Sequence, residues 1–387
     1  MTESTAKKKF PKPLKIVLII LLAAAIVTGV VFAGLAIARA VDIKAIDDLA
    51  LAGQYDNIVL LIGDGMGFDH IAAGRAYLGV QELFMESAAT VRGDVTTFSR
   101  TVVGPTDSAA AATALATGEK TDNGVVGQYL GKDLKNNTEY AMEQGMATGV
   151  IASEGVKGAT PAGFSAHVAN RGDESGILED QLASGIDLFL GGAKDYYDDH
   201  APEIASAGYA YATRVSDLDA QADKVWGAFS ELSTDEAGSD ETPTLAELAE
   251  FGMRYLDAAS GGEGFFLMIE ESHIDKCSHN GDIKGMLEHL TAYDRTIERV
   301  LAVAEELPGS TLVIATADHE TGGLEYSGES ADMLSDDMFT TGSHTTDNVP
   351  YFVYSEVEGL PETIDNTQIA TVIRGYILRR QTARAAA

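Results

Sequence analysis

The chain has 387 residues, of which 45% are hydrophobic, and its 27 basic and 59 acidic side chains give a net charge of −32. This length and apolar content exclude a disordered chain and allow one large core or two. The single cysteine, Cys277, excludes an internal disulfide framework and a multi-cysteine metal site. The acidic balance argues against a nucleic-acid partner, whose phosphates would be repelled.

The amino-terminal region differs from the rest, because a basic segment over 1–15 precedes 23 uncharged residues over 16–38. Such a helix is long enough to cross a bilayer core of about 30 Å. The lysines before it predict a cytoplasmic amino terminus and an exported remainder. A cleaved signal peptide is the alternative, since Ala38-Arg39-Ala40 resembles a cleavage site, although its apolar region normally spans only about 7–15 residues. We expect an uncleaved membrane anchor and an extracytoplasmic protein, which would be secreted or periplasmic if the segment were cleaved.

Residues 39–55 are expected to form a connector, and alternating strand and helix patterns then fill 56–380. This alternation predicts an α/β fold, a three-layer α/β/α sandwich with a central, mostly parallel, doubly wound sheet. Continuous apolar runs predict buried strands over 57–62, 149–152, 188–190, 264–269 and 311–315, with an edge strand over 351–354. Helices are expected over 108–117, 244–259, 283–306 and 367–379. The acidic stretch 201–242 is expected to be a surface excursion, and 381–387 a frayed tail.

The first chemical signal is Gly63-Asp64-Gly65-Met66-Gly67, directly after the strand over 57–62. A dinucleotide-binding turn would need glycine at position 68, which is Phe68, and has no carboxylate within it. Asp64 instead places an oxygen ligand at the carboxyl end of a central strand, where open α/β sheets bind ligands. A simple helix cap is the alternative.

The second signal is Thr106-Asp107-Ser108 before an alanine run that ends at Gly118. Alanine has the highest helix propensity, and glycine is a common helix stop. Ser108 would lie in the first turn, where free N–H groups and the helix dipole favour an anion. The alternative is that Ser108 only caps the helix.

Carboxylates and imidazoles follow the next predicted strands. Glu270 closes the strand over 264–269, and the four-residue gap from Asp275 to His279 places both on one helical face, which suits two ligands of one Zn²⁺. A surface ion pair is the alternative. Asp318 and His319 follow the strand over 311–315 and could share one metal ion at a bent strand end.

His344, in Gly342-Ser343-His344-Thr345, adds a fifth candidate, with an ordinary loop histidine as the alternative. Together these motifs supply a zinc-compatible mixture of ligands, mostly at strand ends. The remaining histidines are expected to be structural or superficial: His70, His167, His200, His273 and His289.

These motifs resemble the alkaline phosphatase family. The resemblance rests on the GDGMG turn, the T-D-S-A-A-A-A-T-A-x-A-T-G segment, the E-x-x-x-I-D-K-x-x-H block, T-A-D-H-E-T-G-G, and H-T before Val349-Pro350, in the family's order over 57–379. It implies a phosphomonoesterase with two Zn²⁺ and one Mg²⁺, acting on small phosphomonoesters in phosphate scavenging. A homodimer is a further expectation.

The resemblance also implies roles for individual residues. Ser108 is similar to the nucleophile that forms a phosphoserine, and Arg171 to the arginine that binds phosphate through two hydrogen bonds. Lys276 could reach phosphate through water. The implied first-zinc ligands are Asp275, His279 and His344, the second-zinc ligands Asp64, Asp318, His319 and Ser108, and the Mg²⁺ ligands Asp64, Thr160 and Glu270.

The chain also departs from the family pattern. Gly158 lies where the family often carries Asp or His near Mg²⁺, and Glu271 lies where a small residue is common. Ser108 is followed by alanines, which excludes the sulfatase motif. Two alternative functions remain: a phosphodiesterase, and a membrane-tethered protein that binds metal or phosphate without catalysis.

Overall fold

The computed structural model describes residues 54–101, 103–328, 330–357 and 359–384. The predicted basic segment, the predicted anchor over 16–38 and nearly all of the connector lie outside these residues. No helix among the described residues is both long and apolar enough to cross a membrane.

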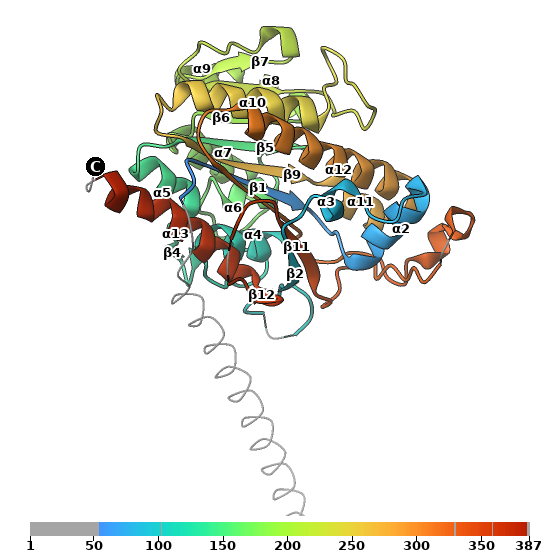
Figure 1. Cartoon of the computed structure of the whole chain (residues 1–387). Helices are drawn as coiled ribbons and strands as arrows, with labels where there is room; N and C mark the ends of the chain where they lie inside the picture. The colour runs from blue at the N-terminus through green and yellow to red at the C-terminus, as the bar shows by residue number, and fades with distance from the viewer. Residues whose placement is uncertain (1–53, 102, 329, 358, 385–387) are drawn as a thin grey trace, which may run out of the picture. The chain divides into compact units, whose positions relative to one another are not determined.

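A ten-stranded sheet forms the centre of the fold, in the order β12-β2-β11-β10-β1-β9-β5-β6-β8-β7 (Figure 1). Its pairs are parallel except where β11 lies antiparallel between β10 and β2. The strands are β1 (Asn57–Gly63), β2 (Val91–Thr96), β5 (Ala147–Ala152), β6 (Leu188–Gly191), β7 (Ala210–Ala212), β8 (Val225–Ala228), β9 (Phe265–Glu271), β10 (Thr311–Thr316), β11 (Val349–Val353) and β12 (Thr363–Asp365). A separate two-stranded ribbon pairs β3 (Gln128–Tyr129) with β4 (Lys132–Asp133).

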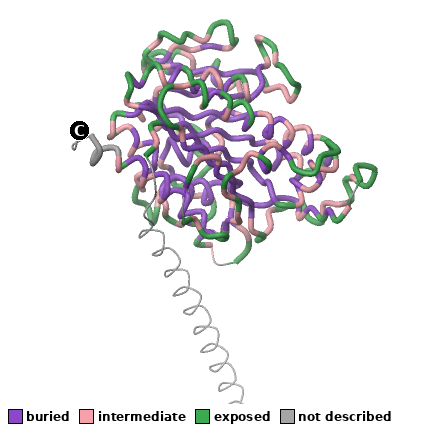
Figure 2. The backbone as a smooth tube through the Cα atoms, viewed as in Figure 1, coloured by how far each residue is buried: buried purple, intermediate pink, exposed green. Residues whose placement is uncertain are grey.

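The central strands are buried on both faces, as their continuous apolar sequences predict. Every residue of β1, β5, β6 and β9 is buried. Figure 2 shows these strands as a buried layer inside a partly exposed shell. The strands predicted over 57–62, 149–152, 188–190, 264–269 and 311–315 are therefore confirmed, with ends that differ by a few residues.

Helices cover both faces of the sheet, which confirms the three layers (Figure 1). On one face α10 (Leu245–Ala259) packs against α12 (Ile283–Glu306), and on the other α4 (Ser108–Thr117) packs against α6 (Ala159–Gly163) and α13 (Asn366–Arg384). All ten residues of α4 are buried, since its alanines let neighbouring helices approach closely. The other helices are α2 (Phe68–Leu78), α3 (Phe84–Ser87), α5 (Asn137–Glu143), α7 (Glu174–Ala183), α8 (Lys194–Asp198), α9 (Ala201–Ser206), α11 (His273–His279), η1 (Val215–Asp217), η2 (Ala331–Met333) and η3 (Asp336–Met338).

Three parts of the predicted fold need correction. The stretch 201–242 is not only a surface excursion, because it contributes β7 and β8 to the sheet and buries Trp226 among Phe189, Tyr197 and Tyr209. The strand predicted over 351–354 exists as β11 but is internal, since β2 and β12 lie beyond it. Helix α13 runs to Arg384 and so includes the first residues of the segment expected as a tail.

Candidate active site

The carboxyl ends of three neighbouring strands bring acidic side chains together. Asp64 follows β1, Glu270 lies near the end of β9, and Asp318 follows β10. Ile62 of β1 is in register with Glu270 on one side and with Thr316 on the other, so the three strands end at one level. This edge is where parallel sheets bind ligands, as the sequence predicts.

Asp275, His279 and His344 form one group of donor atoms, which we call the outer group. The Nε2 atoms of His279 and His344 lie 3.1 Å apart, and Asp275 Oδ1 lies 3.3 Å from the first and 3.6 Å from the second. Asp275 and His279 are brought together because 273–279 is helical.

Backbone carbonyls orient both imidazoles of the outer group. His279 Nδ1 is 2.9 Å from the Gly342 carbonyl oxygen, and His344 Nδ1 is 2.8 Å from that of Thr106. A carbonyl only accepts, so each Nδ1 carries a proton, and the lone pair available to a metal ion is that of Nε2, which faces inward. Two such lone pairs and a carboxylate oxygen at contact distance repel one another, and a divalent cation between them would remove that repulsion.

Asp64, Asp318 and His319 form a second group, the inner group, and all three are buried. His319 Nε2 lies 3.1 Å from Asp318 Oδ2 and 3.6 Å from Asp64 Oδ1. Both of these carboxylate oxygens are buried without a hydrogen-bond partner among the described residues. Buried oxygens of this kind are costly unless a cation or donor satisfies them, so the inner group also fits a divalent metal ion.

Thr321 joins the two groups and fixes the tautomer of His319. Its hydroxyl donates to Asp275 Oδ1 at 2.5 Å. The hydroxyl oxygen then accepts from His319 Nδ1, which lies 3.1 Å away. His319 Nε2 therefore carries a lone pair that faces Asp64 and Asp318, as a metal ligand would.

Ser108 is the first residue of α4 and lies against the inner group. Its Oγ is 3.2 Å from His319 Nε2, and its side chain is almost completely buried. Asp107, not Ser108, is the helix cap, because its carboxylate accepts from Ala110 N at 3.0 Å. The Ser108 hydroxyl therefore does not cap the helix, and it lies at the positive end of the helix dipole.

Two basic side chains lie near this centre with acidic partners. Arg171 Nη1 contacts Asp107 Oδ2 at 3.2 Å, and the same oxygen accepts from Gly124 N at 3.0 Å. Lys276 Nζ is paired with Glu154. Arg171 is therefore held beside the start of α4, whereas Lys276 is held by a carboxylate that the sequence did not single out.

A third set of oxygen atoms lies around Glu270. Glu270 Oε2 and Thr160 Oγ1 are buried without a hydrogen-bond partner among the described residues, and such hard donors suit Mg²⁺. Glu154 takes up the space beside Gly158, because a Cβ on that glycine would lie 2.5 Å from Glu154 Oε1. The carboxylate of Glu154 thus lies beside Gly158, which has no side chain of its own.

The pKa values show how much negative charge this centre gathers. Burial, with the charges of Asp318 and Asp275, raises the pKa of Asp64 well above its usual value. Burial raises the pKa of Asp318 to about 6, and burial with the Glu154 charge raises that of Glu270 to about 8. Burial lowers the pKa of His319 well below its usual value. Divalent cations would stabilise the ionised carboxylates and neutral imidazole that they need as ligands.

The glycines of the GDGMG turn serve close packing. Gly65 has a φ of 77°, and a Cβ there would lie 2.8 Å from Asp275 Cα and 2.9 Å from Thr321 Oγ1. The turn therefore brings the backbone of Gly65, next to Asp64, against Asp275 of α11, without any role for a dinucleotide.

Several residues near the site were missed from the sequence. Thr321 and Asp107 lie within motifs that drew attention to their neighbours, and Glu154 follows β5 as a strand-end acid. His273 and His289, expected to be structural or superficial, lie together with Glu271 as a third group of possible metal ligands. Helices α11 and α12 bring these histidines together, which no local pattern indicated.

Comparisons with known proteins agree with this geometry. The family model described as alkaline phosphatase matches residues 55–372. Alkaline phosphatase 3 of Bacillus subtilis (strain 168) is 32% identical over 345 residues, covering 82% of this chain and 71% of that protein. Alkaline phosphatase 4 of the same organism is 33% identical over 294 residues, covering 69% of this chain and 62% of that protein.

A solved structure agrees as well. The alkaline phosphatase from the Antarctic bacterium TAB5 has a TM-score of 0.71 and 27% identity, covering 84% of this chain and 98% of that one. A variant of that enzyme was solved with Mg bound in a site called M3. The family match and the named relatives support a phosphomonoesterase. The chain belongs to the alkaline phosphatase family.

Proposed function

We propose that this protein hydrolyses small phosphate monoesters through a phosphoserine intermediate on Ser108. The observation that carries the proposal is the position of this hydroxyl, at the first residue of α4 and 3.2 Å from His319 Nε2 of the inner group. The hydroxyl oxygen would attack phosphorus and lose its proton to water, and the ester oxygen would leave with its electron pair and take up a proton. Water would then attack phosphorus, breaking the bond to Ser108 Oγ, releasing phosphate and returning a proton to the serine oxygen.

The protein groups around Ser108 suit a transferring phosphoryl group. The first turn of α4 offers free N–H groups and the positive end of the dipole. Arg171 lies beside this turn and can offer two parallel hydrogen bonds to phosphate oxygens. Asp107 both caps the helix and contacts the guanidinium, so one carboxylate aligns the two anion-binding elements. This alignment stabilises charge on the equatorial oxygens.

The donor sets support a metal requirement. We assign one Zn²⁺ to the outer group, a second Zn²⁺ to the inner group with Ser108, and one Mg²⁺ to Asp64, Thr160 and Glu270. When bound, such ions lower the pKa of an attached hydroxyl group and neutralise charge on the attacking and leaving oxygens. The buried oxygens of Asp64, Asp318, Thr160 and Glu270 that lack hydrogen-bond partners support this assignment.

A role in phosphate scavenging outside the cytoplasm accompanies this activity in our proposal. It is supported by the uncharged stretch 16–38 behind a lysine cluster, which predicts export and an uncleaved anchor. Amino-terminal sequencing of the exported protein would show whether 16–38 is retained. Growth of a deletion strain on a phosphomonoester as the phosphorus source tests the scavenging role, and light scattering tests the expected homodimer.

The activity is tested with p-nitrophenyl phosphate and its bis-ester, with and without EDTA. We expect monoester turnover that EDTA abolishes, and a Ser108→Ala variant that loses at least about 10³-fold, as for removal of a nucleophile. Ser206→Ala, at an exposed serine of α9, is the matched control and should retain full activity. Faster turnover of the bis-ester would favour a phosphodiesterase. Full activity of Ser108→Ala would refute the proposed nucleophile.

A further inference from the structure

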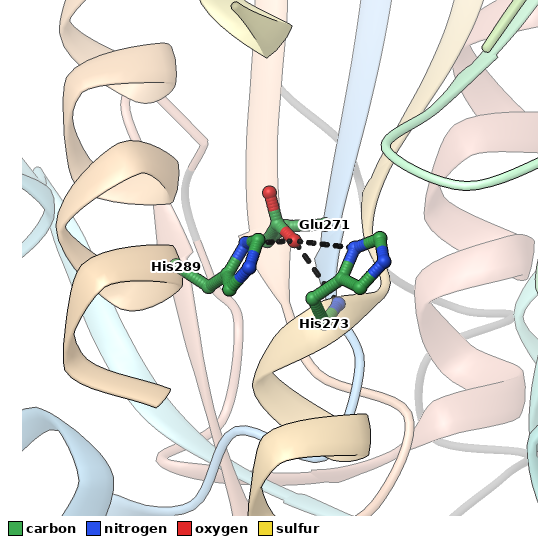
Figure 3. Close-up of side chains that lie close together, drawn as sticks. All are labelled: Glu271, His273 and His289. Carbon is green, nitrogen blue, oxygen red and sulfur yellow. Dashed lines mark hydrogen bonds and ion pairs between the residues drawn. The ribbon is translucent and has the colours of Figure 1, made fainter. Parts of the chain in front are cut away.

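Glu271, His273 and His289 meet from three different elements, and we call them the Glu271 cluster. Figure 3 shows the carboxylate of Glu271, at the end of β9, between the imidazoles of His273 on α11 and His289 on α12. Glu271 Oε1 lies 3.1 Å from His289 Nδ1 and 3.5 Å from His273 Nδ1, and the three donor atoms lie within 4.8 Å of one another. The two rings are stacked, with centroids 4.7 Å apart.

The cluster is separate from the inner and outer groups. Successive side chains of a strand point to opposite faces, so Glu270 and Glu271 leave β9 in opposite directions. Glu270 faces Thr160 and the inner group, whereas Glu271 faces α12. The two histidines line a pocket of about 520 Å³ that Arg171 and Lys157 also line.

The hydrogen bonds of the cluster leave one nitrogen without a partner. Glu271 Oε1 accepts from Ser153 Oγ at 2.9 Å and from the main-chain N of His273 at 3.0 Å, and Ser153 Oγ also lies 3.1 Å from His273 Nδ1. His289 Nδ1 lies 3.1 Å from Glu271 Oε1, but the two atoms do not form a hydrogen bond. This nitrogen is buried and has no hydrogen-bond partner among the described residues. A buried nitrogen in this state lacks the interaction that a cation would give it.

The donor set matches a particular class of metal ion. One carboxylate and two imidazoles are the three protein ligands of many Zn²⁺ sites that keep a fourth position open. Bonds of about 2.0–2.2 Å in a tetrahedral site separate neighbouring ligand atoms by roughly 3.3–3.6 Å. The 3.5 Å from Glu271 Oε1 to His273 Nδ1 lies in this range, and the 3.1 Å to His289 Nδ1 is slightly shorter.

The exposure of the three side chains agrees with such a site. The side chain of Glu271 is 2% exposed, whereas those of His273 and His289 are 32% and 20% exposed. The open side of the cluster thus lies on the pocket side.

We propose that Glu271, His273 and His289 bind an additional Zn²⁺ ion whose fourth position opens to the pocket. Water would fill that position in the resting protein. An oxygen atom of a bound molecule could replace the water, in a pocket lined by both basic side chains, Lys157 and Arg171, and acidic ones, Glu154, Glu174 and Glu231. The site does not depend on the role of Ser108, because it shares no ligand with the inner or outer group.

Metal content tests the proposal independently of catalysis. The full-length protein and its variants are loaded with excess Zn²⁺, freed of unbound ion by gel filtration, and analysed for zinc by mass spectrometry. His289→Gln keeps an amide that can donate to Glu271 but removes the ligand nitrogen, and we expect it to hold about one zinc equivalent less than the wild type. His200→Gln is the matched control, because His200 Nδ1 contacts the Tyr196 carbonyl far from all three groups in sequence, and it should hold the wild-type amount.

Anomalous diffraction from wild-type crystals soaked in Zn²⁺ needs no variant and covers the case in which His289→Gln does not fold. A peak about 2.0–2.2 Å from Glu271 and both imidazole nitrogens is the expected result. Unchanged zinc content in folded His289→Gln, or a wild-type map with zinc elsewhere and none at the Glu271 cluster, would overturn the proposal. If the protein binds zinc at the Glu271 cluster but fails to hydrolyse monoesters, the proposed zinc site is supported and only the proposed function is refuted.

Discussion

Returning Mg²⁺ to the metal-free protein should release protons, and the amount can be worked out from the buried carboxylates. Burial and the charge of Glu154 raise the pKa of Glu270 to about 8, and burial raises that of Asp318 to about 6. At pH 7 a group with a pKa of 8 is about nine-tenths protonated, and one with a pKa of 6 about one-tenth. A carboxylate must lose its proton to bind a cation, so each Mg²⁺ bound through Glu270 should displace about one proton.

Fewer protons should be released at higher pH. At pH 9 Glu270 is about nine-tenths ionised before any cation arrives, so its contribution should fall to about one-tenth of a proton. The same shift affects stability. Because the folded pKa lies above the unfolded value, the free energy of unfolding of the metal-free protein should fall as the pH rises from about 4 to about 8. Bound metal removes this loss.

Calorimetric titration with Mg²⁺ in two buffers of different ionisation enthalpy measures the released protons directly. We expect at least about one proton at pH 7, because Asp64 is a further ligand with a raised pKa, a release at pH 9 that is smaller by most of the Glu270 contribution, and loss of that contribution in Glu270→Gln. Mg²⁺ is the suitable probe because it ligates oxygen and keeps several waters. A release that is zero at pH 7, or equal at both pH values, would refute the reasoning.

Three further predictions concern single groups. Glu154→Gln removes the negative charge beside Glu270 and the partner of Lys276, and we expect Mg²⁺ activation to need about 10–100-fold more Mg²⁺, measured by activity against Mg²⁺ concentration. Trp226→Ala should lower the free energy of unfolding by about 3–5 kcal/mol in urea titrations, because the ring is fully buried. Burial disfavours a charged His167, but hydrogen bonds and the charge of Glu139 outweigh the effect of burial and raise the pKa of His167 to about 9. The stabilisation of the folded protein by His167 and Glu139 should therefore be complete below about pH 6.5 and be lost as the pH rises through about 9.

Each of these predictions has a matched control. Glu174→Gln removes a different acid, on α7, which is paired with Lys157, and it should leave Mg²⁺ activation unchanged. If Glu174→Gln and Glu154→Gln raised the Mg²⁺ requirement equally, a special role for Glu154 would be contradicted. Trp226→Phe should cost less than Trp226→Ala, since the indole nitrogen has no hydrogen-bond partner among the described residues. Glu139→Gln should remove the part of the alkaline destabilisation that His167 causes, and an unchanged profile would exclude this pair.

The sequence predicted the parts of the fold whose local pattern and tertiary environment agree. The interior parallel strands are apolar throughout because both faces are covered, and α4 begins and ends at its predicted residues because of its alanine run and Gly118. Strand β8 was missed because it is four residues long and lies between acidic turns; its burial comes from pairing with β6 and from the aromatic neighbours of Trp226. Strand β2 was missed because Arg92 and Asp94 interrupt its apolar residues.

The candidate site was predictable to the same extent. Donors at the ends of parallel strands must converge, so Asp64, Glu270 and Asp318 could be placed together from the strand pattern. The hydrogen bonds of Thr321 and the pairing of Glu154 with Lys276 depend on side-chain directions that the strand pattern does not contain. His289 lies ten residues beyond His279 on another helix, so only the packing of α11 on α12 brings it to Glu271.

The single proton of the Thr321 hydroxyl has a consequence for metal loading. It points to Asp275, and His319 then keeps its own proton on Nδ1. A cation in the outer group would hold Asp275 in place and keep the hydroxyl in this direction, whereas without it the hydroxyl could turn round and leave His319 free to adopt the tautomer that cannot ligate. We therefore expect the two cation positions to fill cooperatively, with a steeper saturation curve than two independent sites would give, and Thr321→Val to flatten it.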